Sequence, residues 1–135
     1  MYLLIFKRNP MNVKNFLSVY AIAVLIYGIL FLFMPAKAIS MYGGESNPLL
    51  VNAIQGLGSL FIPAAIMAWL AREASASYGR RAILAFIGLS SLIFAIRNIM
   101  AMGGGATTTQ TTIDLVIQVV FAAGGLYFLS KEKGF

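Results

Sequence analysis

The sequence contains neither cysteine nor histidine. Without cysteine the chain forms no disulfide and offers no thiol for redox chemistry. Without histidine it has no imidazole ligand for a zinc ion, a haem or a chlorophyll. These absences exclude thiol-redox membrane enzymes and histidine-ligated centres. We predict no cofactor, and any bound lipid or pigment would be held without histidine.

Charge is also scarce, because charged residues make up 10 % of the chain and a soluble domain carries about 25 %. Acidic side chains are the rarest charged type, with only four in the sequence. They form no pair suited to general acid–base work and no cluster suited to a metal, and no nucleophile stands beside a base. The sequence therefore predicts a protein that is not an enzyme.

Four apolar stretches fill most of the chain. A helix needs about 20 residues to cross the ~30 Å hydrocarbon layer of a bilayer, and each stretch is close to that length. Because the connections are short, consecutive helices are expected to pack antiparallel. We predict an all-α, single-domain membrane protein over residues 1–135, an up-down bundle of four transmembrane helices. The predicted spans are Asn15–Met34, Pro48–Ala71, Ala82–Met102 and Ile113–Ser130.

The basic residues are distributed unevenly about these spans. Only Lys37 lies between the first and second spans, Gly103–Thr112 carries no charge, and Arg97 lies inside the third span. Positive residues concentrate on the cytoplasmic side of membrane proteins, so both termini and the middle loop are predicted to be cytoplasmic. The basic residues behind the net charge of +6 then set the topology and also contact lipid headgroups, and they do not indicate nucleic-acid binding. The residues on the predicted cytoplasmic side are Lys7, Arg8, Lys14, Arg72, Arg80, Arg81, Lys131 and Lys133.

The segment before the first span, residues 1–14, begins with the apolar run Met1–Phe6. This run is too short to cross a bilayer, and it lacks the small-residue cleavage site of a signal peptide. We interpret the segment as a short interfacial anchor or a partner contact, with a native start at Met11 as the alternative.

Turn and capping residues support the span boundaries. Asn47 and Pro48 read as an N-cap followed by the first helical residue, and Gly103–Gly105 is expected to end the third span. Asp114 is expected in the first turn of the fourth span, where a carboxylate suits the helix dipole. Pro63 is expected to kink the second span.

Small residues are expected at the contacts between spans, because membrane helices associate by close packing rather than by a hydrophobic driving force. Aromatic residues near the cytoplasmic ends of spans, Tyr20, Trp69 and Tyr127, are expected in the interfacial aromatic belt. The predicted packing residues are Gly56, Gly58, Ser59, Ala122 and Gly125.

Polar residues from three spans are expected to form a layer at similar depth on the extracytoplasmic side. Arg97 would pair with Asp114, extend outward to the interface, or hold a ligand anion such as a headgroup, a carboxylate or a quinone-like oxygen. Amides beside it would orient that ligand. The alternative is that the layer only joins helices by hydrogen bonds. Its members are Asn52, Gln55, Arg97, Asn98, Asp114 and Gln118.

Two short patterns resemble those of small, uncharacterised bacterial four-helix membrane proteins of the DoxX-like type. Tyr27-Gly28 is followed after five residues by Met34-Pro35, and a glycine-bearing second span ends in Trp69-x-x-Arg72. The resemblance covers the layout of the first three spans. It implies a fold and not an activity.

Two functions fit these observations. The first is a small non-catalytic accessory subunit of a larger membrane complex, energy-transducing or photosynthetic, since almost nothing of the chain lies outside the bilayer. The second is a small carrier or channel that binds an anionic or lipid-like ligand through Pro63 and the layer around Arg97. The predicted partners are membrane lipids and other membrane subunits, and the predicted location is the cell's inner (cytoplasmic) membrane.

Overall fold

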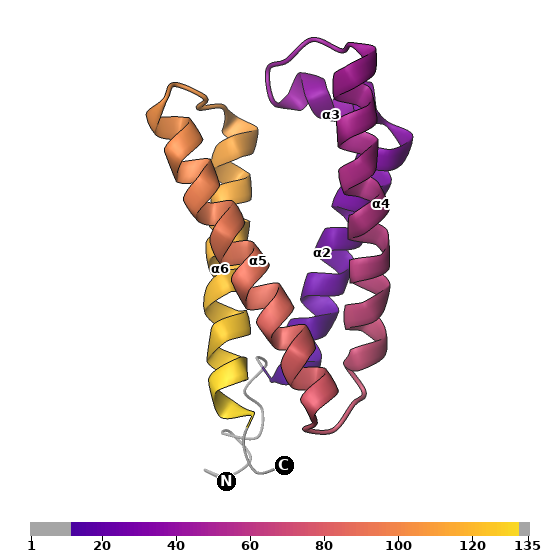
Figure 1. The fold of residues 1–135 in the computed structure, drawn as a ribbon, viewed down its shortest axis with the longest axis vertical. Helices are drawn as coiled ribbons and strands as arrows, with labels where there is room; N and C mark the ends of the chain where they lie inside the picture. Colours follow the sequence, from indigo (N-terminus) through magenta and orange to yellow (C-terminus); the bar gives the residue numbers. More distant parts are fainter. Residues whose placement is uncertain (1–11, 133–135) are drawn as a thin grey trace, which may run out of the picture.

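The computed structural model describes residues 12–132, and within them every regular element is a helix (Figure 1). Four of these helices are long and apolar enough to cross a membrane. The chain is therefore a multi-pass membrane protein with an all-α fold, as predicted. The helices are α2 (Val13–Phe33), α3 (Pro35–Met41), α4 (Pro48–Ala71), α5 (Tyr78–Gly103) and α6 (Thr109–Lys131). The predicted segment before the first span lies mostly outside the described residues.

Side-chain caps define where the long helices begin. Asn47 accepts a hydrogen bond from the backbone N–H of Leu50, and Pro48 is the first residue of α4, as expected. Thr108 caps α6 in a reciprocal capping box with Thr111. This cap starts α6 earlier than predicted, so the expectation that Asp114 lies in the first turn is wrong. Asp114 lies in the second turn of α6, away from the free N–H groups.

The connection after α2 is more regular than the sequence suggested. α2 ends at Phe33, and Pro35 is the first residue of the short helix α3. A positive φ of 80° at Gly43 then turns the chain toward α4. α3 therefore places Tyr42, its C-terminal cap residue, back over the helices instead of in an open loop.

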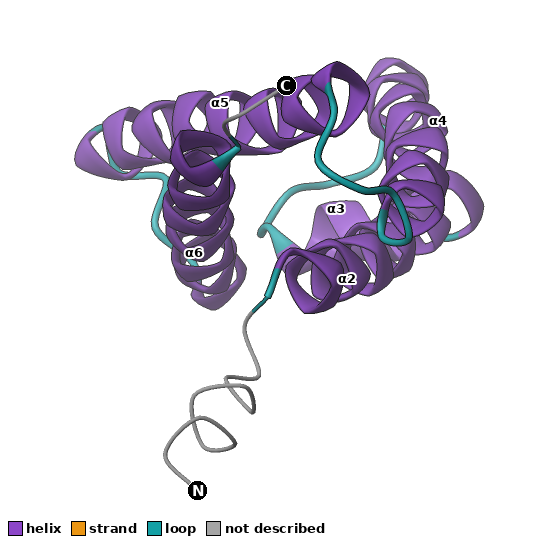
Figure 2. Ribbon diagram, turned by 90° about the horizontal axis from the view of Figure 1, so that it is seen from below, coloured by secondary structure: helices purple, strands orange, loops and turns teal. Residues whose placement is uncertain are grey.

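The long helices form two antiparallel pairs. α2 packs along α4, and α5 packs along α6, whereas the two pairs make few contacts with each other. The pairs converge at one end and separate toward the other (Figure 1). We call the converging end the basic end, because Lys14, Arg72, Arg80 and Lys131 lie there at helix ends, and the other the open end. Viewed along the helices, the two pairs lie side by side (Figure 2).

Glycines allow close contact within each pair. A Cβ added at Gly58 of α4 would lie 2.7 Å from the backbone nitrogen of Leu32 in α2, and one at Gly125 of α6 would lie 2.7 Å from Cα of Gly88 in α5. Backbones that approach this closely leave no room for a side chain. Two predicted packing residues lie elsewhere. Gly56 has no such neighbour within 4 Å, and Ser59 is exposed and donates to the Gln55 carbonyl of its own helix.

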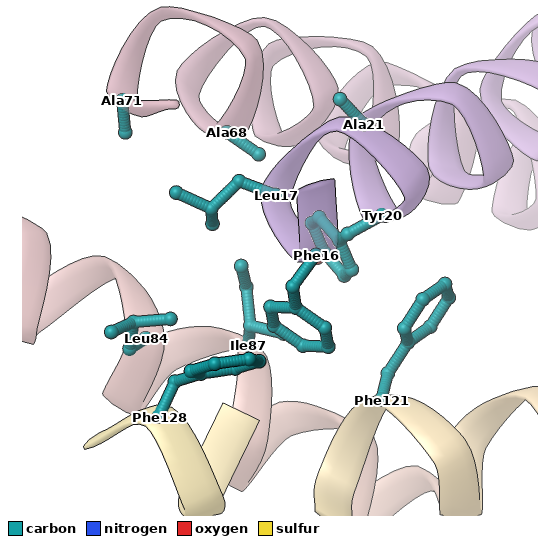
Figure 3. Packing of buried hydrophobic residues seen from close by; sticks show 10 residues of the cluster. All are labelled: Phe16, Leu17, Tyr20, Ala21, Ala68, Ala71, Leu84, Ile87, Phe121 and Phe128. Carbon is teal, nitrogen blue, oxygen red and sulfur yellow. The ribbon is translucent and has the colours of Figure 1, made fainter. Parts of the chain in front are cut away.

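Aromatic side chains fill the space where the two pairs converge (Figure 3). Phe16 of α2 lies against Phe128 and Phe121 of α6, with ring centroids 5.3 and 6.2 Å apart. Tyr20 packs edge-on against Phe121 at 5.1 Å and is only 6 % exposed. The prediction of an interfacial position for Tyr20 is therefore wrong, because it lies one turn above Phe16 on the buried face of α2. Trp69 and Tyr127 are exposed, as lipid-facing anchors would be.

An ion pair closes the basic end. Arg80, in the first turn of α5, forms an ion pair with Glu132 just after α6. Its Nε donates to Glu132 Oε1 at 2.9 Å, and its Nη1 donates to the Ala74 carbonyl at 2.7 Å. One guanidinium thus joins the loop between α4 and α5, the start of α5 and the end of α6.

The glycine contacts predict a stability difference between two Gly→Ala substitutions. Gly125→Ala is expected to lower the free energy of unfolding by about 1–3 kcal/mol, because the new methyl group overlaps the Gly88 backbone. Gly56→Ala is the matched control, and it is expected to leave stability unchanged or higher because its surroundings are open. Thermal unfolding in a neutral detergent measures both. A Gly125→Ala protein as stable as the control would contradict the close packing of α5 and α6.

Candidate functional site: a cavity between the helix pairs

A cavity of about 760 Å³ lies between the two helix pairs. Its volume is within the range of small-molecule binding sites, roughly 300–1,000 Å³. α4 lines it with a stripe of apolar residues at helical spacing: Leu50, Ile54, Leu57, Phe61 and Ala64. The other long helices and Tyr42 complete its walls.

The cavity has a polar end and an apolar end. Polar lining residues lie near the end of α5 and the start of α6, at the open end of the molecule: Arg97, Asn98, Thr108, Thr111, Asp114 and Gln118. Toward the basic end the lining is mainly apolar and includes Phe61, Phe86 and Phe121, with the hydroxyl groups of Tyr20, Ser90 and Ser91 among them. Phe86 and Arg97 are 11 residues apart on one helix, which corresponds to about 16 Å at ~1.5 Å per residue.

Asp114 accepts hydrogen bonds at both carboxyl oxygens. Tyr27 of α2 donates to Oδ1 at 2.6 Å, and Tyr42 donates to Oδ2 at 2.5 Å. Gln110, one turn earlier in α6, donates its Nε2 hydrogen to Oδ1 at 2.8 Å. Asp114 itself is only 9 % exposed. All three partners act as donors, and together they contact both oxygens of the carboxyl group.

The cluster of Tyr27, Tyr42, Gln110 and Asp114 joins the two helix pairs at the open end. Tyr27 and Tyr42 belong to the α2–α4 pair and its connection, while Gln110 and Asp114 belong to α6. Burial raises the pKa of the Tyr42 phenol, and its hydrogen bond to Asp114 raises that pKa further. Tyr42 therefore keeps its proton near neutral pH and acts as a donor.

Asn98 connects α5 to α6 beside this cluster. Its Nδ2 donates to the Thr111 carbonyl at 3.0 Å and lies 3.4 Å from Gln118 Oε1. The side chain is buried, at 8 % exposure. The side chain of Asn98 therefore joins α5 to α6 by hydrogen bonds to the Thr111 carbonyl and to Gln118, as expected if the polar layer holds helices together.

Arg97 lines the same cavity, but none of the ion pairs within residues 12–132 includes it. Its guanidinium lies 5.7 Å from the centroid of the Phe94 ring on its own helix. The predicted alternative in which Arg97 pairs with Asp114 is therefore wrong for this structure. Asp114 has other partners, and Arg97 is exposed.

The structure separates Asn52 and Gln55 from the rest of the predicted polar layer. Neither lines the cavity. Gln55 donates its Nε2 hydrogen to the Leu32 carbonyl of α2 at 3.2 Å, so it joins α2 to α4. Asn52 is exposed. Pro63 is also exposed and absent from the cavity wall, because the lining stripe of α4 runs along a different face.

Sequence reasoning missed Tyr27, Tyr42 and Gln110 as members of the site. One local signal was present for Gln110, which precedes Asp114 by four residues and so shares its helix face. A tyrosine in the middle of an apolar span also needs a partner for its hydroxyl. The partner of Tyr42 is 72 residues away along the chain, and no local pattern identifies it.

Among the described residues, no group of three or more histidine, cysteine, aspartate or glutamate side chains could hold a metal ion. Comparisons of the chain with protein families, curated proteins and solved structures found no match. The DoxX-like resemblance therefore stays a prediction from the sequence.

The hydrogen bonds of Asn98 predict a stability effect. Asn98→Leu is expected to lower the free energy of unfolding by about 1–3 kcal/mol, because it leaves the Thr111 carbonyl and Gln118 without their donor. Asn52→Leu makes the same chemical change at an exposed position and is expected to be nearly neutral. Thermal unfolding in detergent compares the two variants, and equal stabilities would contradict a structural role for Asn98.

Proposed function

We propose that the protein binds an anionic, lipid-like molecule in the cavity between its helix pairs. The observation that carries this proposal is Arg97, a cation on the cavity wall that no acidic side chain of residues 12–132 neutralises. Arg97 lies in the last third of α5, and charged residues within membrane spans are rare and usually mark a functional site. An anionic headgroup would supply the missing partner.

The rest of the cavity suits hydrocarbon chains. Leu57, Phe61 and Phe86 line it below the polar end, and the distance along α5 accommodates an extended chain. Leu60 of α4 and Phe86 of α5 line the cavity yet are 69 % and 49 % exposed. Their positions favour a mouth between α4 and α5, through which a lipid would enter sideways from the bilayer.

We propose a non-catalytic role for this binding. The residue best placed to act as a base, Asp114, accepts three hydrogen bonds from neighbouring side chains. A group engaged in this way orients its neighbours more readily than it takes a proton from a ligand.

The alternative prediction, that the protein is an accessory subunit, depends on the outer faces of the helices, where a partner subunit would bind. Ile26, Leu70 and Val116 are among the exposed apolar residues there, and in a membrane either lipid or a partner subunit covers such residues. Arg97 and the cavity lining favour the binding proposal instead, because a purely structural subunit does not require an exposed cation without an acidic partner at the polar end of the cavity.

The binding proposal predicts that Arg97→Gln selectively weakens binding of an anionic lipid. The purified protein in a neutral detergent is titrated with phosphatidylglycerol or with phosphatidylcholine of the same acyl chains, and native mass spectrometry counts the bound lipids. Loss of a charge-assisted contact is expected to weaken phosphatidylglycerol binding about tenfold or more. Phosphatidylcholine binding is expected to be weak throughout.

Arg81→Gln is the matched control, because Arg81 lies on the same helix at the basic end and does not line the cavity. Equal binding of the two lipids by the unaltered protein would contradict selective recognition of an anion. Loss of phosphatidylglycerol binding in Arg81→Gln as large as that in Arg97→Gln would assign the effect to surface charge.

We also propose that the basic end faces the cytoplasm of the inner membrane. A reporter that is active only in the cytoplasm is expected to be active when fused to the C-terminus and inactive when inserted among Gly103, Gly104 and Gly105. The reverse pattern would place the polar end of the cavity on the cytoplasmic side.

A further inference from the structure

The cavity contains a cation and a carboxyl group that do not pair with each other. Arg97 on α5 and Asp114 on α6 both line it, and these helices pack together. The ion pairs within residues 12–132 include neither residue. Asp114 is buried and Arg97 is exposed, and a buried carboxyl group attracts a nearby cation, so the structure has to provide other partners for Asp114.

Tyr27, Tyr42 and Gln110 are these partners. Tyr27 and Gln110 donate to Oδ1 of Asp114, and Tyr42 donates to Oδ2. Both oxygens of the carboxylate therefore already have close donors. A guanidinium that approached Asp114 would compete for these oxygens with hydroxyl groups supplied by a different helix pair.

The nature of these donors also matters. Two phenols and an amide occupy three of the roughly four acceptor sites of a carboxylate without adding a positive charge. Asp114 therefore does not need Arg97 as a hydrogen-bonding partner, and the guanidinium of Arg97 is available to another anion. The tyrosines at the same time fix Asp114 on the α2 side of the cavity, since both hydroxyls come from the α2–α4 pair and its connection.

We propose that Tyr27 and Tyr42 are positioning residues that keep Arg97 free for an anionic headgroup by occupying Asp114. This inference rests on the proposed function, since it presumes that Arg97 binds the ligand. Without the two hydroxyls, Asp114 keeps only the Gln110 donor in a buried position, and Arg97 is the cation among the residues that line the same cavity. Asp114 then takes Arg97 as its partner and competes with the ligand.

The test is the double variant Tyr27→Phe/Tyr42→Phe, titrated with phosphatidylglycerol and read by native mass spectrometry. Phenylalanine keeps both rings and removes only the hydroxyl groups. Binding is expected to weaken about tenfold or more, as in Arg97→Gln, because both changes remove the same charge-assisted contact. Tyr127→Phe is the matched control, since Tyr127 is exposed and does not line the cavity.

Addition of Asp114→Asn to the double variant separates competition from damage. Asparagine has no negative charge to neutralise Arg97, so phosphatidylglycerol binding is expected to recover toward that of the unaltered protein. Weak binding that Asp114→Asn does not restore would show that the hydroxyls only support the structure and would overturn the inference. Undiminished binding in the double variant would overturn it as well.

Two further comparisons keep the result interpretable. Where the double variant yields no folded protein, Tyr42→Phe alone frees Oδ2 of Asp114 and is measured with and without Asp114→Asn, with the same expected loss and recovery in smaller degree. Failure of the proposed function is distinct, because Arg97→Gln would then bind phosphatidylglycerol as well as the unaltered protein does.

Discussion

The hydrogen bonds from Tyr27 and Tyr42 to Asp114 join two helix pairs that otherwise touch mainly at the basic end. Within each pair, glycine contacts bring the backbones together, whereas between the pairs Gly124 of α6 lies against the ring of Phe16 of α2 near the basic end. A buried carboxylate is costly unless donors surround it, so the carboxylate and its donors have to stay together. These hydrogen bonds therefore limit how far the two pairs separate at the open end, and they lie at the edge of the cavity between the pairs.

The membrane environment explains why such a cavity is compatible with a stable fold. Lipid tails are as apolar as the helix faces, so helices gain little by closing every gap between apolar surfaces. Tight packing occurs where backbones meet at Gly58 and Gly125, and where Phe16 lies between Phe121 and Phe128. Between these places the apolar stripe of α4 faces the cavity. In a membrane this apolar surface contacts hydrocarbon rather than water, so leaving it unpacked carries little cost in free energy.

The candidate site was predictable only in part. Arg97, Asn98, Asp114 and Gln118 were expected at one depth, and all four line the cavity. Depth follows from residue count along a helix, but the direction in which a side chain points depends on the rotation of the helix against its neighbours. Gln55 therefore lies at a suitable depth but contacts α2.

The sequence by itself determined the helical class, the four long apolar helices and most of their ends, because hydrocarbon thickness and local capping residues act over short stretches of chain. The tertiary structure decided that Asp114 accepts hydrogen bonds from two tyrosines and that Arg97 has no acidic partner among the described residues. These outcomes depend on contacts between residues 72 and 87 positions apart. Such contacts form only after the helix pairs have packed, so no local pattern encodes them.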